Sequence, residues 1–429
     1  MIGGLRDWLH RRRHPERFAR LDELLRHQAD SREQILRRQE EDLARIVAFA
    51  AANTDYYAQR FAGIPGDAAL HDLPVLSRDE VIAHRDAMLA RGADRGRAHV
   101  GHTGGSTGQP LAFYWDAARH ELMRAGMMRS YMGSGWRPGE RIVNFWGAGQ
   151  DLRRASLGKK YGEIITGEKT FGAREISAAK LREWAACVRA YRPVLLQGYA
   201  SILAALARFV LDHGMAMPAT LRGVYSTAEV LTHEQREAME RAFGCKVFNQ
   251  YGSREIPNIA CECRHGNMHV FTDMVYLESV ARDGEPDRLL VTSLTNRLMP
   301  MIRYDIGDTG RLLEGDCSCG WPFPLMEMGM CRQNDLIRAP GGKSIHPSYF
   351  NGLLYGMGAI RQYQFVQVAP ERIVLKLVAT SPVGAGALDS LREKIRRDVD
   401  AGMMLDVDYV DAIPRTASGK HRFVFSQVG

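Results

Sequence analysis

The 429-residue sequence has no apolar run approaching the ~18–20 residues that a membrane-spanning helix needs. Its first seven residues also lack the apolar core of a secretory signal, so we expect a cytoplasmic protein. Seven cysteines are too few for a disulfide scaffold in a chain of this length. Basic residues exceed acidic ones only slightly, 57 against 50, which does not demand a nucleic-acid partner.

Part of the basic excess lies near the start of the chain. Five arginines there are expected to form a solvated basic arm, and contact with a nucleic acid or a membrane surface is the alternative. They are Arg11, Arg12, Arg13, Arg17 and Arg20. Elsewhere the composition is that of an ordinary globular protein, with 45% hydrophobic and 25% charged residues. The length allows two or three domains.

The order of apolar patterns predicts an α/β fold. Between about residues 100 and 300, short apolar runs alternate with stretches of helical periodicity. Strands are expected at 141–146, 194–197, 223–226 and 289–293, and helices at 33–50, 116–132, 177–190 and 199–213. A further helix is expected after Ser77, a typical N-cap residue. Residues 1–95 would form a helical leader and cap.

A polar, glycine-rich passage near residue 332 predicts a domain boundary. We expect a large N-terminal α/β domain over 1–331, a hinge at 332–336 and a small mobile α+β lid domain over 337–429. Within the small domain, strands are predicted at 362–368, 373–377 and 405–410, with one helix that presents Leu388, Leu391, Ile395 and Val399 on one face.

A glycine-rich loop at 102–110 contains three glycines and three hydroxyl side chains. Such a loop can surround phosphate oxygens with N–H and hydroxyl groups, because glycine permits positive φ and close approach of the backbone. A tight hairpin loop is the alternative, since residues 111–115 alternate like a strand. The loop lacks the Gly-Lys-Ser/Thr of a Walker motif.

Five segments, in order over about 320 residues, resemble the motifs of adenylate-forming enzymes, the superfamily of acyl-coenzyme A synthetases, luciferases and peptide-synthetase adenylation domains. They are Thr-Gly-Gly-Ser-Thr-Gly-Gln-Pro at 103–110, Tyr-Ser-Thr-Ala-Glu at 225–229, Asn-Gln-Tyr-Gly-Ser-Arg-Glu at 249–255, Arg-Tyr-Asp-Ile-Gly-Asp-Thr-Gly-Arg at 303–311 and Pro-Arg-Thr-Ala-Ser-Gly-Lys at 414–420. The helical start, the short length and two Cys-x-Cys pairs are most similar to the phenylacetate–coenzyme A ligase subgroup, including its capsular-polysaccharide CapK-type members.

The resemblance implies an ATP- and Mg²⁺-dependent ligase that joins a carboxylic acid to AMP, releases pyrophosphate and passes the acyl group to an acceptor. Coenzyme A is the leading acceptor. An amine, a hydroxyl or a carrier-protein thiol is the alternative, giving an amide, ester, heterocycle or other N-acyl product in specialised-metabolite or capsular polysaccharide biosynthesis. A non-catalytic nucleotide-binding scaffold is the further alternative. A homodimer is among the oligomeric states that the sequence permits.

The resemblance also assigns roles to individual residues. Lys420 would contact the carboxylate and the bridging oxygen, Glu255 would bind Mg²⁺, and Asp308 would bind the ribose hydroxyls. Gln109 stands where the loop usually has lysine, and Arg254 beside Glu255 could restore that charge near the phosphates. The remaining nucleotide contacts are assigned to Thr103, Gly105, Ser106, Thr107, Gly108, Ala228, Glu229, Asn249, Tyr251, Gly252 and Arg332.

By the same resemblance, the acid would lie beside aromatic side chains, which suit a flat aryl acid. Packing in the protein core is the alternative for each of them. The residues assigned to this pocket are Phe145, Trp146, Gly147, Tyr199 and Tyr225.

The two Cys-x-Cys pairs and the histidines near the first pair are suitable ligands for a structural Zn²⁺, which takes four such ligands in a tetrahedron. Free thiols are the alternative. The resemblance favours the set Cys263, His269, Cys317 and Cys319, with Cys261 or His265 as replacements. Such a metal clip would brace the nucleotide site without taking part in the chemistry.

Overall fold

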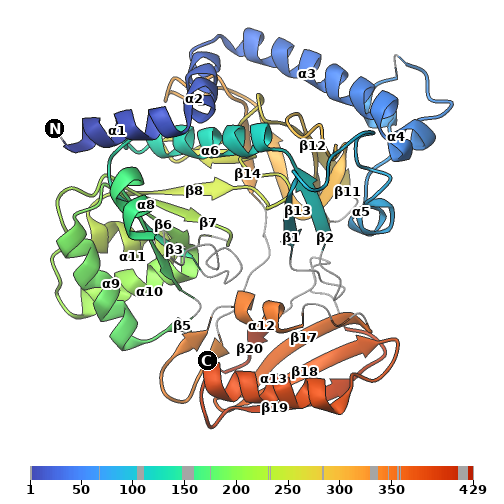
Figure 1. Ribbon diagram of the computed structural model, residues 1–429. Helices are drawn as coiled ribbons and strands as arrows, with labels where there is room; N and C mark the ends of the chain where they lie inside the picture. The colour runs from blue at the N-terminus through green and yellow to red at the C-terminus, as the bar shows by residue number, and fades with distance from the viewer. Residues whose placement is uncertain are drawn as a thin grey trace. The chain divides into compact units, whose positions relative to one another are not determined.

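The computed structural model describes residues 2–66, 68–103, 111–146, 159–173, 175–229, 231, 233–282, 285–328, 337–345, 347–354, 357, 359–413 and 424–428 (Figure 1). They form two compact units. Unit 1 comprises the described residues of 1–103, 111–138 and 248–331, and unit 2 comprises those of 139–247 and 332–429. The predicted hinge at 332–336 lies outside the described residues, so this boundary stays a prediction.

Unit 1 starts with helices, as expected. Ser31 begins the predicted amphipathic helix, because its hydroxyl accepts a hydrogen bond from the Gln34 N–H and the Gln34 side chain accepts one from the Ser31 N–H. Ser77 and Glu80 form the same capping box, so the predicted helix start after Ser77 is confirmed. The helices are α1 (Ile2–Arg13), α2 (Pro15–His27), α3 (Arg32–Asn53), α4 (Asp55–Arg60), α5 (Arg78–His84) and α6 (Ala117–Met132).

The prediction of a solvated basic arm is wrong for Arg17. This residue of α2 is buried, and its Nε donates to Oε2 of Glu121 on α6 at 2.8 Å. A buried guanidinium is tolerated when a carboxylate compensates its charge, and the partner here is distant in the sequence. The start of the chain is therefore packed into unit 1, while Arg11, Arg12 and Arg13 are exposed.

The strands of unit 1 follow the antiparallel order β11-β12-β13-β14-β10-β9-β8, with residues 248–251 of β8 in this unit. They are β8 (Lys246–Tyr251), β9 (Ala260–Glu262), β10 (Met268–Val270), β11 (Val275–Arg282), β12 (Glu285–Ser293), β13 (Tyr304–Leu313) and β14 (Leu325–Met328). The order shows that neighbours in space are not always neighbours in sequence, because β14 lies between β13 and β10.

A separate antiparallel hairpin pairs β1 (His99–Thr103) with β2 (Leu111–Trp115), and Thr103 lies opposite Leu111. The glycine-rich segment 104–110 connects these strands and lies outside the described residues. Its two interpretations, phosphate loop and hairpin connection, are therefore compatible with each other.

Unit 2 contains the parallel strands β4-β3-β6-β7, with α9, α10 and α11 packed against them (Figure 1). Buried residues of all three helices, such as Trp184, Ile202 and Met239, share one core with Val143 and Val224 of the strands. The elements are β3 (Ile142–Trp146), β4 (Glu168–Gly172), β6 (Leu195–Tyr199), β7 (Gly223–Thr227), α8 (Lys159–Thr166), α9 (Ala178–Tyr191), α10 (Ala200–Asp212) and α11 (His233–Phe243). The predicted α/β alternation is confirmed.

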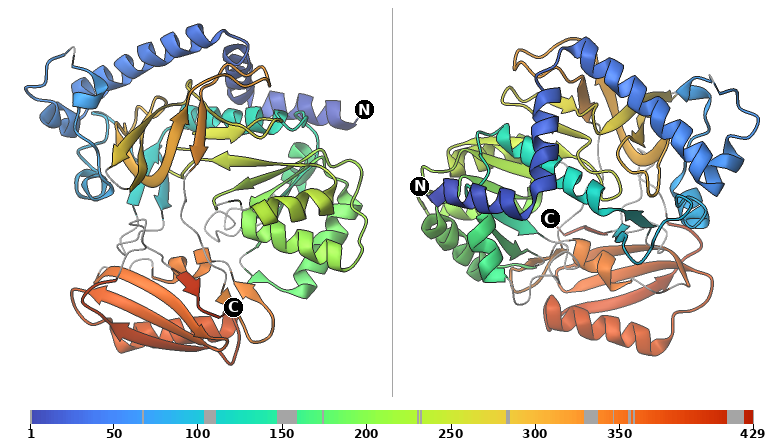
Figure 2. Two further views of the ribbon diagram at one scale, coloured as in Figure 1. Left: turned by 180° about the vertical axis from the view of Figure 1, so that it is seen from behind. Right: turned by 45° about the horizontal axis from the view of Figure 1, so that its top comes forward.

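The C-terminal part of unit 2 is a four-stranded sheet in the order β19-β18-β17-β20, with α13 on one face (Figure 2). Leu391 and Ile395 of α13 are buried, as the helical spacing predicted. The elements are β17 (Ile360–Ala369), β18 (Arg372–Ala379), β19 (Met404–Tyr409), β20 (Val424–Ser426), α12 (Pro347–Leu353) and α13 (Ala385–Asp398). A small sheet joins β15 (Ile337–Arg338) and β16 (Ser344–Ile345) to β5 (Glu175–Ile176).

Among the described residues, none of the helices combines the length and the apolar character that a membrane crossing requires.

Candidate active site

Glu255 lies in the compact loop between β8 and β9. The Ser253 N–H donates to the Ile256 carbonyl at 2.9 Å, and the Ile259 N–H donates to the Tyr251 carbonyl at 3.1 Å. A Cβ atom at Gly252 would lie 3.0 Å from the backbone nitrogen of Asn258, so the close approach of the two loop segments favours glycine there. The predicted residues Asn249, Tyr251, Gly252 and Arg254 therefore lie on the same strand end and loop as Glu255.

The carboxylate of Glu255 is buried and held by a neighbouring strand. The Tyr304 hydroxyl, on β13, donates to Oε1 of Glu255 at 3.2 Å. One oxygen is thereby committed to a neutral donor, and the carboxylate keeps a second oxygen with which to bind a cation. Tyr304 belongs to the motif at 303–311, but the sequence alone assigns it no role.

Arg119, at the start of α6, is a second contact of Glu255 that sequence reasoning missed. Its Nη2 donates to the backbone carbonyl of Glu255 at 2.7 Å, and its side chain is buried. Burial lowers the pKa of Arg119 to about 10, although the Asp116 and Glu255 carboxylates oppose that shift. The guanidinium therefore stays charged at neutral pH and fixes the loop to α6.

Asp308 and Tyr251, which belong to different motifs, are in contact. The Tyr251 hydroxyl donates to Oδ2 of Asp308 at 3.1 Å. A carboxylate offers only acceptor lone pairs and so matches the two hydroxyls of a ribose. The Tyr251 ring of β8 and the Asp308 carboxylate of β13 therefore lie side by side.

The base of the glycine-rich loop lies near Arg254. Arg254 Nη1 donates to the His102 carbonyl at 3.4 Å, and Arg78 Nη1 donates to Oγ1 of Thr103 at 2.9 Å. Two arginines thus flank the last described residues before the loop, and the compensation of Gln109 by Arg254 stays a prediction.

In unit 2, the predicted residues gather at the carboxyl ends of parallel strands, where open α/β sheets bind ligands. Trp146 ends β3 and Tyr199 ends β6, and their rings meet edge to face with centroids 5.2 Å apart. Ala228 follows β7 with φ +69°, a conformation that is uncommon for a residue other than glycine. Glu229, the next residue, is partly buried.

Two of the predicted pocket aromatics are fully buried. Phe145 packs against Phe171 and Trp184, with ring centroids 5.8 and 5.2 Å away, and its side chain is 0% exposed. Tyr225 is also 0% exposed. The core alternative therefore describes both Phe145 and Tyr225. Trp146, which is partly exposed, and Tyr199, which is 6% exposed, remain the aromatic candidates at the strand ends.

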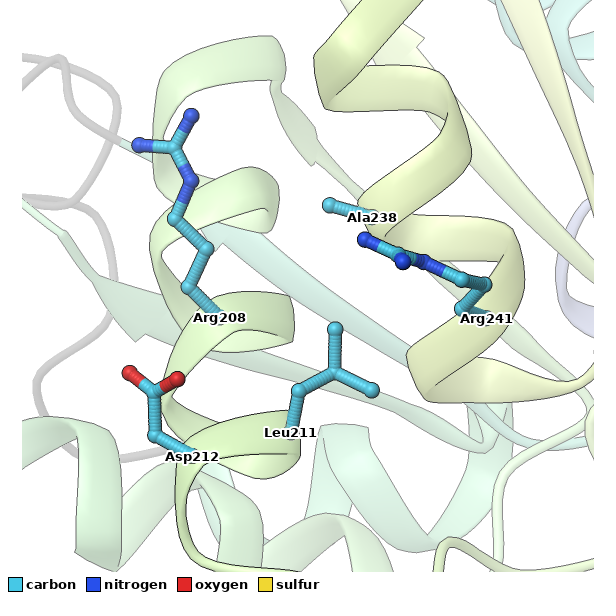
Figure 3. Close-up of a pocket in the computed structure, with 5 residues that line it drawn as sticks. All are labelled: Arg208, Leu211, Asp212, Ala238 and Arg241. Atoms are coloured by element: carbon cyan, nitrogen blue, oxygen red, sulfur yellow. The ribbon is translucent and has the colours of Figure 1, made fainter.

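A groove of about 420 Å³ opens between α10 and α11 and is lined by Arg208, Leu211, Asp212, Ala238 and Arg241 (Figure 3). The residues predicted to bind the acid or the nucleotide are not among those that line it. The groove is therefore separate from the strand-end site of unit 2.

The four preferred zinc ligands come together in unit 1. Their ligand atoms all lie within 4.8 Å of one another, and the four residues are Cys263, His269, Cys317 and Cys319. The Cys263 and Cys317 sulfurs are 3.7 Å apart, and the Cys319 sulfur is 3.4 Å from Nε2 of His269. Tetrahedral zinc with ordinary bond lengths places two sulfurs about 3.8 Å apart and a sulfur and a nitrogen about 3.5 Å apart. The donor set therefore fits zinc.

The surroundings of His269 also suit a metal ligand. Its Nδ1 is 3.0 Å from the Phe323 carbonyl, which orients the ring with Nε2 toward the thiols. Burial lowers the pKa of His269, which favours the neutral form that binds metals. Of the proposed replacements, Cys261 is directed to the Glu262 carbonyl at 3.6 Å and His265 to the Ser318 hydroxyl at 2.8 Å, and neither belongs to the cluster.

The remaining predicted site residues fall outside the described part of the chain. They are Gly105, Ser106, Thr107, Gly108, Gly147, Arg332 and Lys420.

Comparison with known proteins identifies relatives. Residues 337–427 match the model of the CapK C-terminal domain. The chain is 23% identical to protein CapK of Staphylococcus aureus over 378 residues, covering 84% of this chain and 81% of that protein. It is 26% identical to a phenylacetate-coenzyme A ligase of Thermus thermophilus over 437 residues, covering 92% of this chain and 96% of that protein.

A solved structure of 2-hydroxyisobutyryl-CoA ligase, in complex with 2-HIB-AMP and CoA, has the same fold. Its TM-score is 0.62 at 20% sequence identity, covering 94% of this chain and 91% of that chain.

The chain therefore belongs to the superfamily of adenylate-forming enzymes, within the class of AMP-forming ligases. Its relatives there are CapK and the phenylacetate-coenzyme A ligases.

Proposed function

We propose that this protein activates an aromatic carboxylic acid with ATP in the cytoplasm, releases pyrophosphate and transfers the acyl group to coenzyme A. The observation that carries the proposal is the pair of hydrogen bonds that joins two of the superfamily motifs, Tyr304 to Glu255 and Tyr251 to Asp308. Each contact joins a residue of one motif to a residue of the other, so the groups assigned to Mg²⁺ and to the ribose are both held by the neighbouring motif.

Within this proposal, Glu255 holds Mg²⁺, which neutralises phosphate charge when bound. The Tyr304 hydroxyl fixes the carboxylate, and Arg119 fixes the backbone that carries it. Asp308 accepts hydrogen bonds from the ribose hydroxyls, and Tyr251 and Asn249 are assigned to the adenine. In unit 2, Ala228 and Glu229 are the residues assigned to the adenine. Lys420 supplies a positive charge to the carboxylate and the bridging oxygen during adenylation. The loop residues 105–108 and Arg332 bind the phosphates and ribose.

The aromatic ring of the acid is assigned to Trp146 and Tyr199. Their edge-to-face pair lies at the strand ends of unit 2, and such rings favour a flat apolar group. The phenylacetate-coenzyme A ligases among the relatives support an aryl acid.

Another acceptor is the second candidate. It would be an amine or a hydroxyl in capsular polysaccharide biosynthesis, and the similarity of residues 337–427 to the CapK C-terminal domain is the reason that an acceptor other than coenzyme A is kept.

Pyrophosphate release with ATP and Mg²⁺, measured over a panel of aryl and aliphatic acids with and without coenzyme A, tests the proposal. We expect release that depends on an aryl acid and an acyl-coenzyme A product. Release that leaves coenzyme A unreacted would favour the second acceptor class. ATP binding without release from any acid would favour a nucleotide-binding scaffold.

Zinc at the four-residue cluster is a separate proposal. It would connect the β9–β10 turn to the segment after β13, and so brace β9, which follows the Glu255 loop, and β13, which carries Asp308. Elemental analysis should find about one zinc per chain, lost in Cys317→Ser and retained in the control Cys187→Ser. Stable, metal-free wild-type protein would contradict it.

A further inference from the structure

Helix α1 exposes an apolar stripe. Leu5 is 60% and Trp8 53% exposed, the two highest values among the large apolar side chains of the described residues. Because residues three and seven apart lie on one side of a helix, Arg12 falls on the same stripe as Leu5 and Trp8. Its guanidinium lies over the Trp8 ring, 5.5 Å from the centroid. A large aromatic and a large aliphatic side chain are therefore presented together with a cation.

The opposite side of α1 attaches the helix to α2. Nε2 of His10 is 3.1 Å from Nη1 of Arg17, and the His10 and Phe18 rings have centroids 5.1 Å apart. His10 is the one buried side chain among the described side chains of α1. Arg11 adds to this attachment, because its guanidinium lies over the Phe18 ring, 4.5 Å from the centroid, and its Nη1 is 4.0 Å from Oδ2 of Asp22. A helix of this length is marginal by itself in water, and these contacts leave the side with Leu5 and Trp8 uncovered.

The charge on α1 is strongly positive. Its four arginines face one acid, Asp7, which pairs with Arg11 at 3.0 Å. Arg12 and Arg13 are exposed and form no ion pair in the part of the chain that the structure describes. The stripe is thus bordered by cations whose charge is not compensated locally.

We propose that α1 docks the protein onto an anionic lipid surface, with Leu5 and Trp8 in the interface and Arg12 and Arg13 at the headgroups. Indole rings and aliphatic side chains partition into that interface, and arginines are attracted to the negative surface. A second copy is a poorer occupant, because a symmetric contact through the stripe would bring like charges together. This inference goes beyond the proposed enzymatic function and does not depend on it.

Co-sedimentation with lipid vesicles tests the docking. Wild-type protein should bind vesicles of equal parts phosphatidylcholine and phosphatidylglycerol, bind phosphatidylcholine vesicles weakly, and dissociate at high salt. Each basic residue near an anionic surface contributes about fivefold to partitioning, so reversing both charges in Arg12→Glu/Arg13→Glu should weaken binding by at least about 25-fold. Leu5→Ala/Trp8→Ala should weaken it by about tenfold or more.

Leu211→Ala is the matched control, because Leu211 is 39% exposed on α10, far from α1 in the sequence, and its variant should bind like wild type. Leu5 and Trp8 are exposed, so thermal unfolding of their variants should match wild type. Absence of wild-type binding to anionic vesicles, or equal binding by all variants, would overturn the proposal. Light scattering tests the alternative of a second copy. If the wild-type protein dimerises without lipid and Leu5→Ala/Trp8→Ala abolishes the dimer, lipid docking is overturned in favour of a second copy.

Discussion

Helix α6 carries two buried arginines whose surroundings differ. Arg129, in its last turn, forms a bidentate pair with Asp273, with Nη1–Oδ2 and Nη2–Oδ1 distances of 2.6 and 2.9 Å. It also lies over the Phe271 ring, 4.2 Å from the centroid. Arg119, in the first turn, donates instead to the Glu255 carbonyl, and burial lowers its pKa to about 10.

The two arginines show two uses of a buried charge. A bidentate carboxylate compensates a desolvated guanidinium well, and this pair anchors α6 to the segment before β11. A carbonyl carries only a partial charge and compensates less. The less favourable arrangement occurs at the loop that carries Glu255, so we infer that Arg119 is kept there to orient that loop.

The largest expected effect is on stability, from Arg129→Met. The substitution leaves the buried Asp273 carboxylate without its main partner, which should lower the free energy of unfolding by about 3–5 kcal/mol. Urea denaturation measures this loss. Arg11→Met is the control, because it removes solvent-accessible ion pairs with Asp7 and Asp22 while a methionine can still cover the Phe18 ring, and it should cost at most about 1 kcal/mol. Equal losses in the two variants would show that Arg129 is not a structural anchor.

Arg119→Met should destabilise less, by about 1.5–3 kcal/mol, because one charge-assisted hydrogen bond is lost while the cost of burying the charge is relieved. Its effect on pyrophosphate release should be larger than that of Arg129→Met at a temperature where both variants are folded. Arg119→Lys, which keeps a donor, should recover part of the activity. The contrast between the two arginines fails if Arg119→Met loses more stability than Arg129→Met and keeps full activity.

Tyr304→Phe removes only the hydroxyl that fixes Glu255. A hydrogen bond of this kind is worth about 0.5–1.5 kcal/mol, so the Mg²⁺ concentration for half-maximal pyrophosphate release should rise about two- to tenfold. Tyr57→Phe is matched to it, because Tyr57 is also buried and donates to the Pro300 carbonyl at 3.1 Å, in a contact that does not include Glu255. An identical Mg²⁺ requirement in both variants would remove the positioning role.

Sequence reasoning predicted the fold well where its signals are local. The helix expected at 177–190 is α9, Ala178–Tyr191, because the Ser177 hydroxyl caps it and apolar spacing defines its buried face. The Arg17–Glu121 pair was not predictable in this way, since it joins residues from helices far apart in the sequence. The expectation of a solvated arm failed for that reason.

The candidate site shows the same division. Three members of the proposed metal cluster, Cys263, Cys317 and Cys319, were predictable because Cys-x-Cys pairs are a local pattern typical of zinc sites, whereas the choice of His269 over Cys261 depended on the family resemblance. Arg119 was not, because α6 also contains Arg124 and Arg129, and nothing in the periodicity marks which arginine meets Glu255. Contacts across the fold decide that, and one sequence does not reveal them.

The smallest expected effect concerns His120, the residue next to Arg119. Burial lowers the pKa of His120 to about 4, and His99 and Arg124 add to the shift. Above about pH 6.5 the imidazole is neutral in the folded and the unfolded protein, so its protonation does not affect the free energy of unfolding there. As the pH falls from about 6.5 to about 4, the unfolded chain binds a proton that the folded protein resists, so stability should fall.

Comparing urea unfolding of wild type and His120→Asn across this pH range tests the expectation. The variant should lose less stability on acidification, by a modest margin because the imidazole is only half-buried. His233→Asn, at an exposed position on α11, should follow wild type. His120→Asn could instead lose as much stability on acidification as wild type. In that case the first turns of α6 do not disfavour positive charge in general, and the low pKa of Arg119 reflects its own buried position beside Glu255.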